Sequence, residues 1–480
     1  MAQFTASESH ATAPGAAIGA TFKQRAHNKL HDAKLQRAMK NFNLAGARAR
    51  AMAEVDNLED LRTDAAGIRD RALADLDVWL ERFETEARRR GTQVHWAETH
   101  ADINRIVLEI AAKASVRKVI KSKSMVSEES HLNAALEANG LEVVETDLGE
   151  YIIQLRGEAP SHIIAPAIHL NRDDVADLFA EHHKTPRNND PAVLTMEARK
   201  VLREHFLSGD MGISGANFLI AETGSVFLVT NEGNGRLTTT MPRVHVAITG
   251  IEKVVPTLED VSSLLRVLTR SATGQSISNY VTLATGPKRA GDTDGPDEMH
   301  VIIVDAGRSK LLGTDMQEAL RCIRCGACMN HCPVYQNIGG HAYGWVYPGP
   351  IGAVLTPNYI GLENALDLPN AATLCNQCGV VCPVKIPLPD LMRKLREKQV
   401  ERGLRPWQER VGLRIWVWFA ARPGLYSLAT KIAARVGRMA GGASGLIHKL
   451  PGNGWTEERD FPAPQGKTFR ELYAAGKRGR

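Results

Sequence analysis

Apolar residues recur at three- and four-residue steps between Leu58 and Arg90, and this spacing predicts helix. From there to about residue 310, helical patterns alternate with short β-like runs. The predicted helices are 103–115, 127–139, 172–182, 195–207 and 258–269. The predicted strands are 116–122, 141–146, 151–155, 162–166, 216–221, 225–230, 244–249, 278–285 and 299–304. This alternation is typical of an α/β domain with a largely parallel sheet, which we place at 58–310.

Basic segments flank this domain on either side. Phe22 to Arg50 carries eight basic residues, one acidic residue and no proline, which predicts a basic helical arm within residues 1–57. Both a solvated helix and a docking surface for an acidic partner fit such an arm. Between Leu391 and Leu450, thirteen Lys and Arg residues stand against three Glu. We therefore expect a basic C-terminal tail domain at 393–480.

The tail also contains an amphipathic stretch. On a helix, Val411, Ile415, Trp418 and Phe419 fall on one face, beside Arg410 and Arg414. Three uses of this face remain open: packing on the chain's own cysteine region, docking in a partner's groove, and contact with an anionic membrane.

Composition narrows the class of protein. The chain has 480 residues, of which 43% are hydrophobic and 24% charged, as in globular proteins of two to four domains. The net charge of +5 does not indicate nucleic-acid binding. No apolar run approaches the length of a membrane span, and no basic n-region precedes an apolar stretch near Met1. We expect a cytoplasmic protein whose membrane contact, if any, is peripheral at the inner face.

All seven cysteines lie between Cys322 and Cys382. An odd number of cysteines crowded into one region of a cytoplasmic protein favours metal binding over disulfides. The first four have the spacing C-x2-C-x2-C-x3-C-P, ending at Pro333, which is the bacterial ferredoxin pattern. In that pattern three thiolates hold one [4Fe–4S] cluster, and the fourth holds another.

The second motif contains Cys375, Cys378 and Cys382, and Ala372 stands where its first cysteine would be. Crossed ligation predicts two ligand sets. Cluster one takes Cys322, Cys325, Cys328 and Cys382, and cluster two takes Cys332, Cys375 and Cys378. Three thiolates suit a [3Fe–4S] centre or a [4Fe–4S] centre with a ligand of another kind. Two clusters indicate electron transfer.

The surroundings of the motifs predict an α-helical ferredoxin-like domain at 311–392. The spacer between the motifs is rich in glycine and aromatic residues from Ile338 to Gly352, which suits either close packing against a cluster or a turn-rich loop. We expect His331 and His341 to be structural residues rather than cluster ligands.

Two polar segments of the α/β domain are candidates for ligand binding. Residues 121–129 combine hydroxyls, lysines and a helix start that suit an anion such as a carboxylate, or simply a capped helix with Ser127 as N-cap. Residues 222–225 and 231–234 form a second polar pair, equally consistent with turns. Nucleotide-binding and zinc-protease motifs are missing from the sequence, and we assign no catalytic residue.

The ordered motifs resemble the lactate utilisation protein B family from about residue 20 to the end. They are Ala221 to Ser225, the first cysteine motif, Gly339 to Gly344, Tyr347 to Gly352, and the tail pattern Trp455-x3-Arg459-Asp460-Phe461-Pro462. The resemblance implies that the α/β domain is a LUD domain, of the isomerase and deaminase type of fold. It also implies that the three-cysteine second motif is the family's own pattern.

In function, the resemblance implies an iron–sulfur electron-transfer subunit of a complex that oxidises L-lactate to pyruvate. The partners would be a subunit rich in Cys-Cys-Gly motifs and a lone LUD protein, and the chain would not act as an enzyme alone. A redox-sensing protein without substrate turnover is the alternative.

Overall fold

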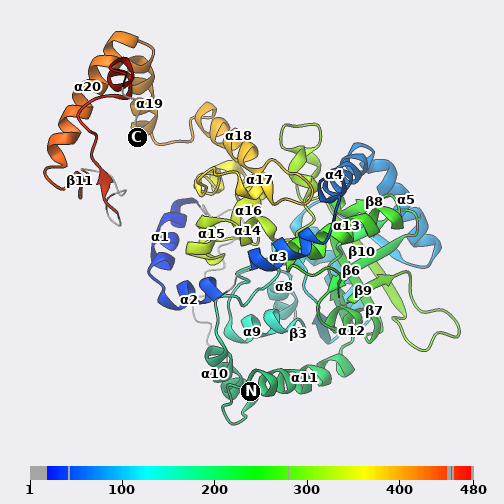
Figure 1. Cartoon of the computed structure of the whole chain (residues 1–480). Coiled ribbons are helices and arrows are strands. Elements are labelled where there is room, and N and C mark those ends of the chain that lie inside the picture. The colour runs from blue at the N-terminus through cyan, green and yellow to red at the C-terminus, as the bar shows by residue number, and fades with distance from the viewer. Residues whose placement is uncertain (1–18, 42–43, 279, 451–455, 457–458, 477–480) are drawn as a thin grey trace. The chain divides into compact units, whose positions relative to one another are not determined.

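The computed structural model describes residues 19–41, 44–278, 280–450, 456 and 459–476. The chain divides into two compact units. The first ends at Lys398 and holds both large sheets and all seven cysteines, and the second begins at Gln399. In Figure 1 the α/β elements of the first unit run from blue to green, and the cysteine region follows in yellow.

A parallel six-stranded sheet forms the centre of the first unit (Figure 1), in the order β1-β10-β7-β4-β2-β3. The strands are β1 (Gln93–Ala97), β2 (Lys118–Lys121), β3 (Glu142–Glu145), β4 (Met211–Ser214), β7 (Val244–Gly250) and β10 (Glu298–Val304). Every residue of β7 is buried, as expected for a parallel strand covered on both faces.

Successive residues of β7 pack against opposite layers of the domain. Val246 and Ile248 pack with Ile103 of α6 (His100–Lys113) and with α8 (Leu132–Ala138). Ala247, between them, packs with Phe83 of α5 (Leu76–Arg89) and with a second sheet. The period of two along a strand places these side chains on opposite faces. The domain is therefore layered, with helices on one face of the sheet and a mixed layer on the other.

The second sheet has four strands in the order β8-β5-β6-β9. They are β5 (Phe218–Ile220), β6 (Ser225–Thr230), β8 (Val254–Val255) and β9 (Tyr280–Ala284). The remaining helices of the domain are α4 (Leu58–Ala74), α7 (Met125–Glu129), α9 (Leu148–Arg156), α10 (Arg172–His183), α11 (Pro191–Ser208), α12 (Asn234–Thr240) and α13 (Leu258–Ala272).

Two predicted strands are wrong. Residues 151–155 belong to helix α9, because Asp147 caps its start by accepting the Glu150 amide at 3.1 Å and Gly157 ends it at φ 70°. The described residues 162–166 form no strand. There the His162 ring accepts the amides of Ile164 and Ala165 at 3.0 and 3.1 Å, which holds the backbone in a turn instead.

The predicted helix 127–139 is two helices, α7 and α8, separated at His131, which has φ 52°. Ser124 caps α7, so the expected N-cap at Ser127 is also wrong. Strands β1 and β4 were not predicted from the sequence, because each is only four or five residues long and lacks a run of branched apolar side chains.

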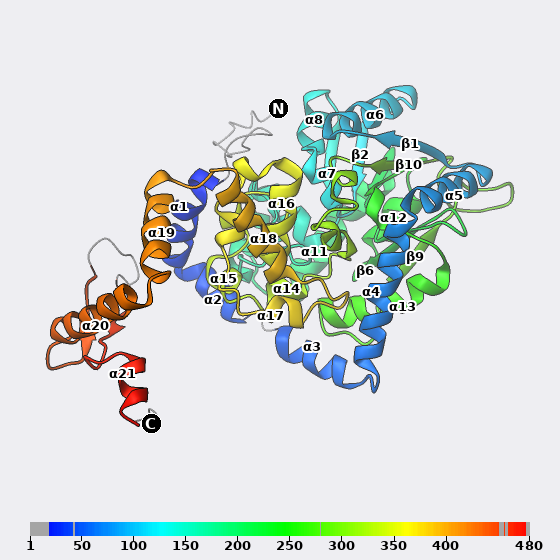
Figure 2. The same ribbon diagram turned by 90° about the horizontal axis from the view of Figure 1, so that it is seen from above.

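The basic N-terminal segment packs against the cysteine region. Its helices are α1 (Gly19–Leu30), α2 (Ala33–Asn41) and α3 (Leu44–Ala53). Figures 1 and 2 both show α1 and α2 beside α15 (Pro333–Ile338). Phe22 and Leu35 are buried, and Arg48 donates to the carbonyl of Val381 at 2.8 Å. The segment is therefore not a freely solvated arm.

The second unit is helical. It contains α19 (Trp407–Ala420) packed on α20 (Pro423–Ala440), a short antiparallel pair of β11 (Leu446–Ile447) and β12 (Phe461–Pro462), and α21 (Phe469–Ala474). Helix α18 (Leu388–Glu401) spans the boundary between the units. Among the residues that the structure describes, no helix is long and apolar enough to cross a lipid bilayer.

Candidate functional site

The seven cysteines lie in two loops of the first unit. The first loop follows a 3-10 turn at Gln317–Arg321, continues into α14 (Ala327–Asn330), and places Cys332 at the N-cap of α15. The second loop places Cys375 before α17 (Gln377–Val380), Cys378 within it, and Cys382 after it. We call residues 322–332 the first loop and 372–382 the second loop.

The two loops share a backbone conformation, position by position. Arg324 and Leu374 correspond in the aligned motifs, and both have left-handed φ, at 58° and 56°. Gly326 and Asn376 also correspond, at 73° and 64°, and each precedes a short helix. Left-handed backbone is costly for a side chain such as leucine or arginine. Its recurrence indicates that both loops are shaped for the same task.

The thiols form two neighbouring sets. Burial, and then Cys382 and Cys322, raises the pKa of Cys325 to about 12. Burial, followed by the thiols of Cys325, Cys322 and Cys382, raises the pKa of Cys328. In the second set, burial and then Cys332 and Cys375 raise the pKa of Cys378 to about 12. Cys378, from the second set, also raises the pKa of Cys328, so the two sets adjoin each other.

This donor chemistry fits iron–sulfur clusters. Buried thiols without cations resist ionisation, whereas iron supplies the positive charge that holds them as thiolates. Three cysteine sulfurs accept hydrogen bonds from backbone amides. The donor–acceptor distances are 3.4 Å from the Arg324 amide to Cys322 Sγ, 3.5 Å from the Tyr335 amide to Cys332 Sγ, and 3.3 Å from the Ile386 amide to Cys382 Sγ. Amide donors of this kind tune the potential of a cluster.

The two loops differ in exposure. In the first loop all four cysteines are buried, at 7–9% relative exposure. In the second loop, residues 373–377 are exposed, Cys375 among them. The first set of thiols therefore lies inside the unit, and the second set reaches its surface.

A chain of buried charges connects the first loop to the sheet. Arg308 bonds Glu129 at 2.6 Å and Glu252 at 3.0 Å, and all three side chains are inaccessible to solvent or nearly so. Glu252 also meets Arg324 of the first loop at 3.4 Å. Lys253 donates to the carbonyl of Cys322 at 2.9 Å, and burial, followed by Arg324, lowers its pKa to about 7. Arg308, Glu252 and Lys253 were not singled out from the sequence. The pair Glu252 and Lys253, which stands between the apolar residues Ile251 and Val254, was a usable signal.

A cavity of about 540 Å³ lies between the sheet and the first loop. The residues after β2, β4 and β7 line one side, and Ile323, Arg324 and Cys325 line another. Ligands of open parallel sheets bind at the carboxyl ends of the strands, which is this edge. The side chains of Lys123, Lys253 and Arg324 border the cavity together with the carboxyl groups of Asp147 and Glu232, so it suits a polar ligand, such as an organic acid, that also carries apolar surface.

The structure brings together some of the predicted polar residues and separates others. Residues 122–126 and most of 231–234 line the cavity. Lys121 does not; it pairs with Glu145 at 2.6 Å. Residues 222–225 lie elsewhere, where Glu222 accepts the first amide of α13 at 3.1 Å. A Cβ at Gly224 would lie 2.3 Å from the Ala87 nitrogen, so that motif serves packing against α5.

The histidines of the cysteine region contact backbone carbonyls. His331 Nδ1 bonds Ala327 O at 3.0 Å, and His341 Nε2 bonds Ala159 O at 2.7 Å. The glycine-rich spacer packs closely on protein: a Cβ at Gly340 would lie 1.7 Å from Ser161 O, and one at Gly352 would lie 1.7 Å from Tyr347 O. Tyr343, from the same spacer, is buried beside Cys332 and Cys328, which contribute to its raised pKa.

Fold and site together define an iron–sulfur protein in which two cysteine loops are joined to an α/β domain. Residues 80–304 match the LUD domain family, and 318–386 match the 4Fe-4S dicluster domain. Residues 392–478 match a third family, lactate utilisation protein B, C-terminal.

Relatives over almost the whole chain settle the family. Lactate utilization protein B of Bacillus licheniformis is 43% identical over 458 residues, covering 94% of this chain and 96% of that one. The protein of the same name from Shouchella clausii is 44% identical over 461 residues, with 95% and 97% covered. The uncharacterized electron transport protein YkgF of Escherichia coli is 42% identical over 463 residues, with 94% and 96% covered. The chain belongs to the lactate utilisation protein B family.

Among solved structures, a DUF162 family protein of Deinococcus radiodurans covers 48% of this chain and 98% of its own. It is 15% identical with a TM-score of 0.28, which is too low to support a comparison of folds.

Proposed function

We propose that the chain is the electron-transfer subunit of a complex that oxidises L-lactate to pyruvate and supports growth on lactate. The observation that carries this proposal is the position of the first loop, which borders both the cavity and the second set of thiols. Electrons entering at the cavity would have a short route to the exposed second loop. The proposed partners are a Cys-Cys-Gly subunit and a lone LUD protein.

We assign the ligands in two sets. Cys322, Cys325, Cys328 and Cys382 hold the first cluster, and Cys332, Cys375 and Cys378 hold the second. The mutual influence of the thiols supports this crossed arrangement. The second cluster is a [3Fe–4S] centre, or a [4Fe–4S] centre whose fourth ligand is not a cysteine of this chain.

Each cluster, when bound, carries one electron at a time. Lactate oxidation releases two electrons and two protons, so two clusters match the electron count. The protein's own residues bury the first loop, hold its sulfurs with amide donors, and leave the second loop open to a partner. Among the described residues we assign no base and acceptor for lactate oxidation, and we propose that the chain needs its partner subunits for this reaction.

We place the carboxylate of an organic acid in the cavity, against Lys123. This lysine is half-buried, with 20% of its side chain exposed, and it pairs with Glu150 at 3.0 Å, so an incoming carboxylate would find a cation already held in place. Lys123→Gln should weaken lactate-dependent reduction chiefly through KM in the assembled complex, whereas Lys200→Gln on the exposed face of α11 should change nothing. An unchanged KM in Lys123→Gln would remove the carboxylate from this position.

The function is tested with the purified, anaerobic chain and its two partner subunits. The chain alone should show two clusters by EPR and by iron and sulfide content, and should not be reduced by L-lactate. Addition of both partners should make lactate reduce the clusters. A redox sensor would show clusters that respond to oxidants yet remain oxidised under lactate with both partners present.

A further inference from the structure

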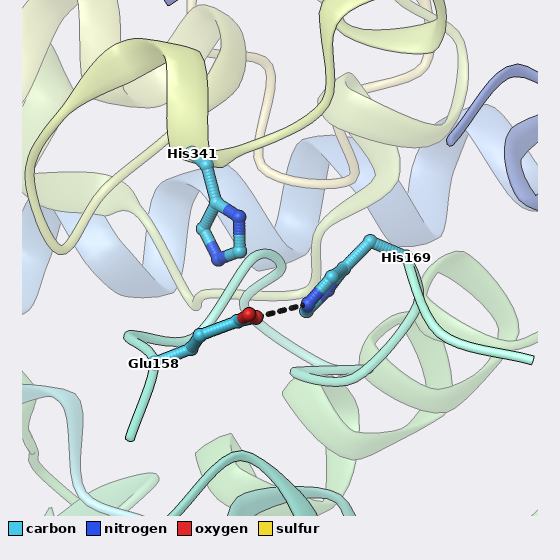
Figure 3. Close-up of side chains that lie close together, drawn as sticks. All are labelled: Glu158, His169 and His341. Atoms are coloured by element: carbon cyan, nitrogen blue, oxygen red, sulfur yellow. Dashed lines mark hydrogen bonds and ion pairs between the residues drawn. The ribbon is translucent and has the colours of Figure 1, made fainter. Parts of the chain in front are cut away.

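Three potential metal ligands meet outside the cysteine loops, at Glu158, His169 and His341 (Figure 3). One atom from each of the three side chains lies within 4.8 Å of the other two. Glu158 follows the C-terminal glycine of α9, His169 precedes α10, and His341 begins the 3-10 turn His341–Tyr343 in the cysteine region. In Figure 3 the His341 ring points towards the Glu158–His169 pair.

Close backbone packing holds these residues together. The segment 158–169 leaves the α/β domain, passes over the first loop and returns. Its Ser161 carbonyl accepts the Tyr335 hydroxyl at 2.8 Å, and the absence of a side chain at Gly340 lets the two backbones touch. His341 Nε2 donates to the carbonyl of Ala159 at 2.7 Å, and a metal bound at this nitrogen would take the place of that hydrogen bond. The ends of the segment and the cysteine region are thus brought to one point.

Hydrogen bonds already orient the Glu158 carboxylate within the trio. Arg156 occupies Oε1 of Glu158 at 2.6 Å, while Oε2 lies 2.7 Å from His169 Nε2. A carboxylate and two imidazoles are common ligands of zinc.

We propose that Glu158, His169 and His341 bind one divalent transition-metal ion, with zinc the best match. Tetrahedral ligand atoms around zinc lie about 3.3 Å apart, so the hydrogen bond between Glu158 and His169 opens by only about half an ångström. The other ring nitrogen of His169, Nδ1, is buried and has no hydrogen-bond partner among the described residues. Three protein ligands leave the fourth position to water or another small ligand.

The ion would hold residues 158–169 in place beside the cavity and the first loop. Residues 163–168 line the cavity, and a Cβ at Gly326 of the first loop would lie 2.8 Å from Ile164 Cδ1. A metal at the two ends of this segment therefore clamps the wall between the cavity and the first loop. The proposal does not depend on lactate as substrate, since it concerns only a metal and the fold.

The test uses the full chain with its clusters assembled anaerobically, because empty cysteines would themselves take zinc. After treatment with a mild chelator, zinc is added and the bound metal is counted by mass spectrometry. Wild type and His182→Asn, a histidine change outside the trio, should each bind one zinc and gain thermal stability. Glu158→Gln and His169→Asn should bind at least about tenfold more weakly, as loss of a ligand requires.

Zinc-edge X-ray absorption separates this site from the cysteines. The trio predicts nitrogen and oxygen ligands at about 2.0–2.1 Å, whereas cysteine-bound zinc shows sulfur at about 2.3 Å. Circular dichroism checks that the variants fold, and Glu158→Gln preserves the size of the side chain. Sulfur ligation, equal zinc affinity in the trio variants, or no zinc bound by wild type would each overturn the proposal.

Discussion

The first and second cysteine loops have the same left-handed positions but lie in different surroundings. The first loop is buried beside the cavity and tied to the sheet through Arg324, Glu252 and Arg308. The second loop is open to solvent at Cys375 and has Ala372 in place of a fourth cysteine. Arginines donate to its backbone carbonyls: Arg48 to Val381 at 2.8 Å, Arg62 to Cys382 at 2.7 Å, and Arg396 to Ala372 at 3.1 Å.

Under the proposed function, this difference would let one repeated motif serve the two ends of an electron path. A buried cluster is shielded from solvent and from oxidants, and lies where a substrate can bind. An exposed cluster can approach a partner's redox centre. The backbone repeat gives both loops the shape to hold a cluster, while their surroundings give each loop a different role.

Cys382→Ser should produce the largest effect and tests whether ligation crosses between the loops. Although Cys382 belongs to the second motif, we expect the first cluster's EPR signal to be lost, together with about half of the iron. The reason is that its thiol lies among those of Cys322 and Cys325. EPR with iron analysis measures this.

Cys375→Ser is the matched control, because it should remove only the second cluster. Should the two serine variants lose the same signal, each loop would hold its own cluster and the crossed assignment would be wrong.

Arg308→Met tests whether buried charges hold the first loop. Loss of the arginine removes the cation that Glu129 and Glu252 share and leaves Glu252 only the longer contact with Arg324, which costs about 3–5 kcal/mol of folding stability. Arg396→Met removes partly exposed hydrogen bonds beside the second loop and should cost about 1–2 kcal/mol. Chemical denaturation of the cluster-loaded protein compares them. Equal losses would show that the two loops are anchored alike.

The α/β fold and the dicluster domain were predictable from the sequence, since strand runs such as 244–249 and motif spacing are local signals. The assignment of each cysteine to a cluster stays a prediction. The resemblance to the lactate utilisation protein B family is confirmed. The cavity wall was not predictable, because the segment around His162 looks like a strand and is shaped by contacts with Asn330 and Tyr335 far along the chain. The same holds for Arg308, whose ion-pair partners, Glu129 and Glu252, lie on two other elements.

Ala372→Cys would make the second loop match the first. We expect the added thiol to complete a four-cysteine set, because Leu374 and Asn376 already have the backbone of the complete motif. If the natural centre is [3Fe–4S], its oxidised EPR signal should fall and a reduced [4Fe–4S] signal should rise. A matched substitution at exposed Thr373, Thr373→Cys, should leave the spectrum unchanged. An unaltered spectrum in Ala372→Cys would show that position 372 of the second loop does not reach its cluster as Cys322 of the first loop does.

The smallest effect on stability is expected in the C-terminal unit. Trp416 and Trp418 are 60% and 49% exposed, and within the described part of this unit α19 contributes no buried side chain. The double change to Ser should alter the free energy of unfolding by less than about 1 kcal/mol, yet reduce co-purification with the partner subunits. A large loss of stability with unchanged co-purification would instead assign this face to internal packing.

The contrast between a buried and an exposed cluster can be measured directly by EPR power saturation. A soluble dysprosium chelate is added to the anaerobic protein, which is measured reduced for [4Fe–4S] signals and oxidised for a [3Fe–4S] signal, and the signals are assigned with the Cys375→Ser and Cys382→Ser variants. The account predicts that the chelate speeds relaxation of the second cluster strongly and of the first cluster little. Equal enhancement of both signals, or a larger effect on the first, would contradict it.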